Sequence, residues 1–94
     1  MKLIAIAAVV SIALAGAGAA NAQEALAKSS GCMNCHAVDT KKAGPAFKEI
    51  AAKYKGKADA EATLVTKLTK GQGHPAVKVS DDDAKGLVKW VLSQ

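Results

Sequence analysis

The chain has 94 residues, and its 13 basic residues are all lysine against 8 acidic residues, a formal net charge of +5. Aromatic residues make up only 3% of the sequence. The lack of arginine and the scarcity of stacking aromatics argue against a nucleic-acid-binding protein. The lysine excess has two interpretations that stay open here: ordinary solubility, and electrostatic steering toward an acidic partner.

The first 22 residues have the pattern of a secretory signal peptide. A positive start, Met1-Lys2, precedes a short apolar run over residues 3–15, and Ala20-Asn21-Ala22 forms an A-x-A cleavage site. An uncleaved membrane anchor is the alternative, but the apolar run is short and ends in small residues. We therefore expect export to the periplasm, removal of residues 1–22, and no integral membrane segment in the mature protein.

Residues 23–94 are expected to form one domain with a thin core. Below roughly 70–80 residues, a hydrophobic core rarely suffices without a disulfide, a metal or another staple. The aromatic residues of this part are Phe47, Tyr54 and Trp90. We therefore expect a further group or cross-link to supply the apolar surface that these side chains do not provide.

Apolar residues recur at helical spacing and nowhere alternate for long enough to make a strand, which predicts an all-α class. The first expected helix covers residues 23–30 and ends at Gly31. The second follows Pro45 and ends before Gly56. Its apolar positions are Phe47, Ile50, Ala51 and Tyr54.

Two further helices are expected toward the C-terminus. The third begins with Asp59 as its N-cap, ends at Gly71, and presents Leu64, Val65 and Leu68 on one face. The last begins at Ser80 in a capping-box arrangement, with aspartates 81–83 in its first turn. Its expected buried stripe is Ala84, Leu87, Val88, Val91 and Leu92. The interior Gly86 predicts a close crossing with the first helix, because an interior glycine otherwise only weakens a helix.

Residues 32–36 read Cys-Met-Asn-Cys-His, the attachment signature of a c-type haem. Two thiols two residues apart can add to the two vinyl groups of one haem, and the adjacent His36 then lies beneath the iron. Three alternatives remain open. They are a disulfide between Cys32 and Cys35, thioredoxin-like exchange, for which no βαβ context is present, and a zinc site that adds His36 and His74 to the cysteines.

The sequence resembles the small soluble bacterial class I cytochromes c over essentially all of residues 23–94. Residues 32–54 carry Cys-x-x-Cys-His, then Gly44-Pro45, then the helix with Phe47, and residues 79–82 and 89–92 also match. The resemblance implies a class I cytochrome c fold, about four short helices wrapped round one covalently bound haem c. It implies thioether bonds at Cys32 and Cys35, His36 as the proximal iron ligand, and a hydrogen bond from His36 to the Pro45 carbonyl.

The sequence departs from that family at the sixth iron ligand. The family supplies a Met followed by Pro before the last helix, and counting back from Val79-Ser80 places His74-Pro75 at that position. Met33 lies between the two cysteines and cannot cross to the opposite haem face. We therefore expect His74 as the sixth ligand, with an open or water-bound iron and a lysine such as Lys78 as alternatives.

The resemblance implies a periplasmic carrier of single electrons, not an enzyme, and a monomer. Two histidine ligands imply a potential below that of Met-bearing relatives. The alternative function is a gas-binding or peroxide-reactive haem protein with an open or displaceable sixth position. The partners are expected to be redox proteins with an acidic docking face. The lysines expected around the docking surface are Lys41, Lys42, Lys48, Lys53, Lys55, Lys57 and Lys78.

Overall fold

The computed structural model describes residues 12–94, which form four α-helices and one short 3₁₀ turn. Residues 1–11, the first part of the expected signal peptide, lie outside the described residues. In chain order the elements are α1 (Ile12–Ser29), η1 (Cys32–Asn34), α2 (Phe47–Tyr54), α3 (Ala60–Lys70) and α4 (Asp81–Leu92). Within residues 12–94 there is no β-strand, so the all-α prediction is confirmed.

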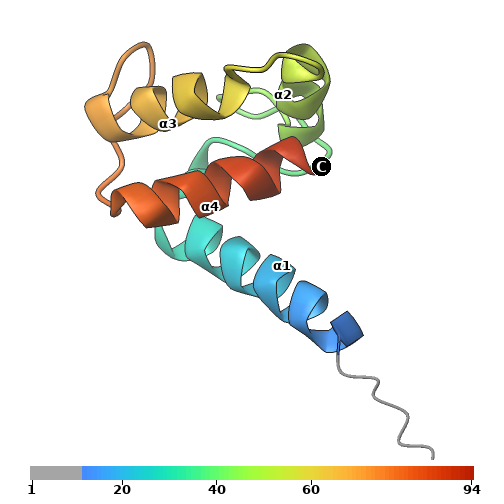
Figure 1. The fold of residues 1–94 in the computed structure, drawn as a ribbon. Coiled ribbons are helices and arrows are strands. Elements are labelled where there is room, and N and C mark those ends of the chain that lie inside the picture. The colour runs from blue at the N-terminus through green and yellow to red at the C-terminus, as the bar shows by residue number, and fades with distance from the viewer. Residues whose placement is uncertain (1–11) are drawn as a thin grey trace, which may run out of the picture.

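Helix α4 is the centre of the fold, because α1, α2 and α3 all pack against it. Figure 1 shows it lying between α1 on one side and α2 and α3 on the other. The helix starts where the sequence predicts: the Asp83 backbone N–H donates to Ser80 Oγ at 3.1 Å. The aspartates of the first turn face the positive end of the helix dipole. The starting point of α4 is thus determined locally.

The crossing of α1 and α4 takes place at Gly86, as the sequence predicts. A Cβ built on Gly86 would lie 2.7–2.9 Å from the carboxamide atoms of Gln23, so a larger residue would displace this side chain from the crossing. Ala27 of α1 and Ala84 of α4 are fully buried, which indicates close contact between small side chains. Helix α1 begins at Ile12 and not at the expected residue 23, because the small apolar residues before Gln23 continue the helix.

The N-terminus of α3 (Ala60–Lys70) differs from the prediction that the Asp59 side chain caps the helix. Asp59 occupies the N-cap position, but its side chain accepts no capping hydrogen bond. The C-terminal end agrees with the sequence, because Gly71 adopts the left-handed conformation, with φ of 67°, and donates to the Lys67 carbonyl at 3.1 Å. Helix α2 has the bounds that its apolar spacing predicts.

Few apolar side chains are buried among the described residues. They are Ala27, Ala46, Phe47, Ala60, Ala84, Leu87 and Val88. The expected stripe on α4 is thus buried only over Ala84, Leu87 and Val88, whereas Val91 and Leu92 near its end are half-buried. Small side chains dominate this set, so direct packing between the helices contributes little apolar area.

None of the helices in the described part of the chain is both long enough and apolar enough to cross a membrane.

We predict that residues 23–94 do not fold without haem. Ordering the backbone costs roughly 1–2 kcal/mol per residue, and the buried set above is too small to offset it. The Cys32→Ala/Cys35→Ala double variant, made without haem, should give the circular dichroism of a disordered chain. Wild-type holoprotein is the matched control and should be strongly helical. A cooperative, helical apoprotein would contradict the prediction.

Candidate functional site

The two cysteines lie on a single tight turn directly after α1. Gly31 leaves the helix in the left-handed region, with φ of 85°, and η1 follows at once. Cys35 N–H and His36 N–H both donate to the Cys32 carbonyl, at 3.2 and 3.0 Å. Both thiols are free; Cys35 is exposed and Cys32 half-buried. Burial raises the pKa of the Cys32 thiol, against a backbone hydrogen bond that lowers it.

The imidazole of His36 is held on several sides. Its Nδ1–H donates to the Pro45 carbonyl at 2.6 Å. Because a carbonyl oxygen can only accept, this bond fixes the proton on Nδ1 and leaves the lone pair of Nε2 for a metal. Phe47 stacks on the ring, with centroids 5.2 Å apart and planes 23° apart. The backbone of Gly44 also lies close against this ring, because a Cβ at position 44 would lie 2.5 Å from His36 Cε1.

The loop that carries His74 is short and tied at both ends. It leaves α3 at Gly71, whose φ is 67°, and it closes where Val77 N–H donates to the Leu68 carbonyl at 2.8 Å. Gly73 is also left-handed, with φ of 71°, directly before the histidine. His74 Nδ1–H donates to the Pro75 carbonyl at 2.8 Å, so its Nε2 also keeps a lone pair.

The structure brings the two histidines together. Their ring centroids lie 6.1 Å apart, and their planes are within 6° of parallel. Metal–imidazole bonds of about 2.0–2.1 Å on both sides of one ion would place two such centroids about 6.3 Å apart. The two rings form a stacked pair whose centroid separation is close to that value. Two thiols on the adjoining turn complete the donor set that a covalently bound haem requires.

Two supports of this site were not predicted from the sequence. Trp90 of α4 packs edge-on against Phe47, with centroids 5.3 Å apart and planes 73° apart, so α4 supports the His36 ring through Phe47. Lys42 Nζ donates to the Met33 carbonyl at 2.8 Å and ties the loop after His36 back to the cysteine turn. No pattern in the sequence indicated the contact between Trp90 and Phe47 or the bond of Lys42 to the cysteine turn.

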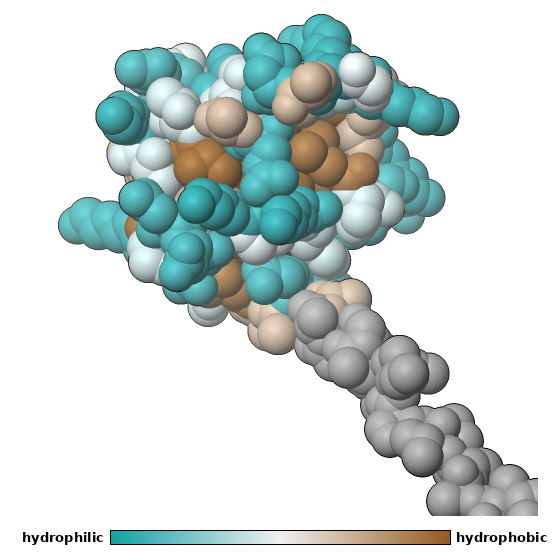
Figure 2. Space-filling view, in the orientation of Figure 1, coloured by the Kyte–Doolittle hydropathy of each residue, from teal (hydrophilic) through white to brown (hydrophobic). Residues whose placement is uncertain are grey.

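Apolar side chains around α3 and the following loop are only partly covered by the polypeptide. They are Leu64, Val65, Leu68, Val77 and Val79, all half-buried. Figure 2 shows apolar groups reaching the surface between polar side chains on one face of the body. Partly exposed leucine and valine side chains of this kind can line one face of a flat apolar group.

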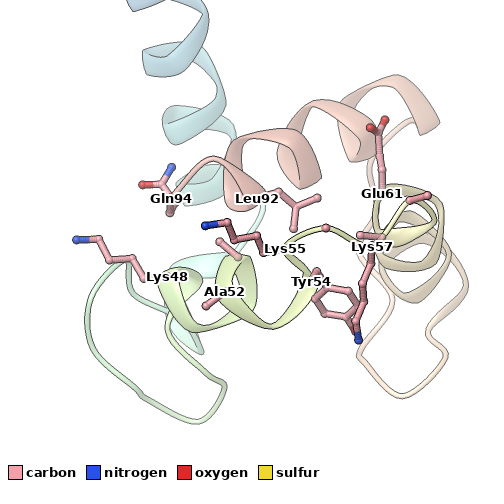
Figure 3. A pocket seen from close by; sticks show the side chains of 12 residues that line it. Lys48, Ala52, Tyr54, Lys55, Lys57, Glu61, Leu92 and Gln94 are labelled. Carbon is pink, nitrogen blue, oxygen red and sulfur yellow. The ribbon is translucent and has the colours of Figure 1, made fainter.

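A separate basic hollow of about 640 Å³ lies at the corner between α2 and α3, next to the end of α4 (Figure 3). It contains none of the candidate haem residues. The lysines that line it are Lys48, Lys55 and Lys57, and Glu61 is its acidic residue. Lys48 forms an ion pair with Asp39 at 2.7 Å, and the Lys57 ammonium lies 5.4 Å from the Tyr54 ring centroid.

The chain matches one protein family and several characterised proteins. The family described as "Cytochrome c" matches residues 19–94. Cytochrome c-551 of Pseudomonas aeruginosa is 51% identical over 78 residues, which cover 76% of this chain and 75% of that protein. Cytochrome c-552 of Nitrosomonas europaea is 46% identical over 89 residues, which cover 86% of each chain.

Solved structures give the same result for the fold. Class 1 cytochrome MtoD from Sideroxydans lithotrophicus ES-1 superposes with a TM-score of 0.72 at 40% identity, over 78% of this chain and 92% of that one. Wild-type Nitrosomonas europaea cytochrome c552 superposes with a TM-score of 0.68 at 45% identity, over 74% and 96%. The fold predicted from the resemblance is therefore confirmed.

We predict that Gly44→Ala displaces the His36 ring, because the new Cβ would lie 2.5–3.0 Å from three ring atoms. Overpacking of this kind typically costs about 1–3 kcal/mol of unfolding free energy. The measurements are thermal unfolding and the electron paramagnetic resonance (EPR) spectrum of the ferric protein, which should become heterogeneous.

Gly56→Ala is the matched control for that variant. Gly56 has φ of 78° with no atom within 4 Å of a new Cβ, so this variant adds backbone strain without touching a histidine. It should lower stability but leave the EPR spectrum unchanged. An unchanged spectrum in Gly44→Ala as well would contradict the assigned role of Gly44.

Proposed function

The chain belongs to the cytochrome c family, and we propose on that basis that it is a periplasmic carrier of single electrons with two histidine ligands on its iron. The family identity establishes a small c-type cytochrome with one covalently attached haem c that acts in electron transfer. The ligand set, the lowered potential and the compartment are the proposed part. The observation that carries it is the parallel pair of imidazoles 6.1 Å apart.

In this proposal the cysteine turn provides the covalent attachment and the proximal ligand. Cys32 and Cys35 form the two thioethers from the tight turn at the end of α1. His36 is the proximal ligand. Its bond to the Pro45 carbonyl fixes the tautomer and the ring orientation and raises the basicity of Nε2.

His74 is proposed as the sixth ligand on the opposite side. Met33 is part of η1, between the two cysteines, and its carbonyl is bound by Lys42, which keeps this residue on the side of His36. Lys78 is exposed and lies three residues before the start of α4. The parallel rings therefore favour His74 over a lysine ligand.

A histidine in place of a thioether lowers the reduction potential. The iron supplies the one-electron couple, and the chain decides which oxidation state is stabilised. Met/His ligation raises the potential of cytochromes c, so a second imidazole, whose nitrogen is a stronger donor, favours the ferric state. Two fixed imidazoles also leave neither axial position for a substrate, which favours electron transfer over the gas-binding or peroxide-reactive alternative.

Export and cleavage after Ala22 complete the proposal for the compartment. The A-x-A site supports it, and so does the family match, which begins at residue 19 and covers the domain expected to remain. Helix α1 runs through the cleavage site, so the bond after Ala22 must leave the helical conformation before it is cut.

We predict that wild-type holoprotein is six-coordinate and low-spin in both oxidation states and lacks an iron–sulfur charge-transfer band. Nearly parallel imidazole planes should give a rhombic ferric EPR signal, whereas perpendicular planes would give a strongly axial one. His74→Ala should give a high-spin or water-bound iron that binds carbon monoxide. His74→Met should raise the potential if the short loop lets the sulfur reach the iron.

Lys78→Ala is the matched control, because Lys78 is the alternative ligand from the same loop. Its spectrum should equal that of wild type. If the spectrum of His74→Ala equals that of wild type, His74 is not the sixth ligand. A wild-type protein that is high-spin and takes up gases would instead favour the sensor or peroxide function.

We predict that the lysines near the haem site dominate docking to an acidic redox partner. Lys41 pairs with His36 through the backbone, so this lysine branches from the chain beside the proposed proximal ligand. Electron-transfer rates should fall steeply with ionic strength, because exposed charges are screened over about 8 Å at physiological salt. Lys41→Gln should flatten that dependence more than Lys85→Gln on α4. If the electron-transfer rate of wild type did not depend on ionic strength, the lysines would contribute to solubility and not to docking.

A further inference from the structure

The side chain of Gln23 has an unusual position for a surface residue. Its carboxamide lies against α4 where Gly86 lacks a side chain, and Nε2 is the nearest of its atoms, 2.7 Å from the point that a Gly86 Cβ would occupy. Oε1 is buried and has no hydrogen-bond partner. Among the described residues it is the one buried side-chain oxygen or nitrogen left in this state. Such an orphan acceptor requires an explanation, because buried polar groups are nearly always paired.

Gln23 is also the residue that cleavage after Ala22 turns into the N-terminus. From the sequence and this packing, we propose that Gln23 is a modification site, at which the mature chain closes to a 5-oxoproline (pyroglutamate) ring. The inference rests on the proposed cleavage. The new α-amine nitrogen attacks Cδ of its own side chain and forms a lactam C–N bond. The Cδ–Nε2 bond breaks, one amine proton passes to the leaving nitrogen, and ammonia departs. The step needs no oxidant, reductant or co-reactant.

The surroundings of Gln23 favour the closed form for two reasons. Ring closure expels Nε2, the atom nearest the point that a Gly86 Cβ would occupy. The orphan oxygen becomes the lactam carbonyl oxygen at the new end of the chain, where water can donate to it, while the ring carbons stay beside Gly86. Closure also removes an ammonium from the N-terminal end of the remaining helix, where the helix dipole disfavours positive charge.

The closed ring would then pack against α4 at the point where α1 and α4 cross. A neutral, blocked end can stay packed beside Gly86, whereas a free ammonium would pull the first turn of the remaining helix toward water. The lactam also removes the free α-amine that aminopeptidases need. The modification therefore protects the element that leads into the cysteine turn.

The test uses the full chain, expressed with haem-ligation machinery and purified from the periplasm as holoprotein. Intact-mass analysis should give residues 23–94 plus one haem, less one ammonia, and N-terminal sequencing should be blocked. A mass without the loss, with glutamine read in the first cycle after prolonged incubation, would overturn the modification. A chain that starts at another residue would overturn the cleavage site as well, and the two failures are therefore distinguishable.

Two variants make the structural part of the inference testable. Gln23→Glu keeps the cleavage site and the side-chain length but cyclises far more slowly, so its first cycle should read glutamate. In wild type, the open and closed forms differ by one charge and can be separated by cation exchange; the closed form should have the higher Tm. In Gly86→Ala the new Cβ displaces residue 23 from the helix crossing. The open and closed forms of this variant should therefore have equal Tm. Equal Tm in wild type would contradict the role in the helix crossing.

Discussion

The polypeptide buries too little apolar side chain to hold its own helices together, and most other features follow from this constraint. Phe47, Leu87 and Val88 are the larger buried side chains in the described residues, and the rest of that set is alanine. Small residues let α1 approach α4 closely at Gly86. They cannot fill the space beside α3, where leucine and valine side chains stay half-covered. A covalently attached haem supplies the missing apolar surface, and covalent attachment keeps so small a domain from losing it.

The two imidazoles are positioned by different interactions, although the same kind of hydrogen bond fixes the tautomer of each ring. Both rings donate Nδ1–H to the carbonyl oxygen of a proline, at 2.6 Å for His36 and 2.8 Å for His74. His36 gains further support from Phe47 and, through it, from Trp90 on the central helix. His74 depends on a loop tied at Leu68 and Val77. The His36 ring is therefore positioned by tertiary packing, and the His74 ring by loop closure.

Local sequence signals predicted the parts of the fold that have local causes. The capping arrangement at Ser80, the left-handed Gly71 and the helical spacing from Phe47 each specify a boundary through interactions within one turn. The predicted start of α1 and the predicted capping bond of Asp59 were wrong. Small apolar residues extend a helix without any pattern that marks its beginning, and a capping residue type does not determine where its side chain points.

The candidate site was predictable in its residues but not in its geometry. The spacing of the cysteines and the position of His74-Pro75 follow from the sequence, whereas the 6° angle between the ring planes depends on two separate backbone conformations. One is the approach of Gly44 to His36, and the other is the pair of left-handed glycines at positions 71 and 73. A short loop with two such glycines leaves little freedom for its histidine. An imidazole also has fewer rotatable bonds than a thioether, so this loop leaves few orientations for the ring of His74.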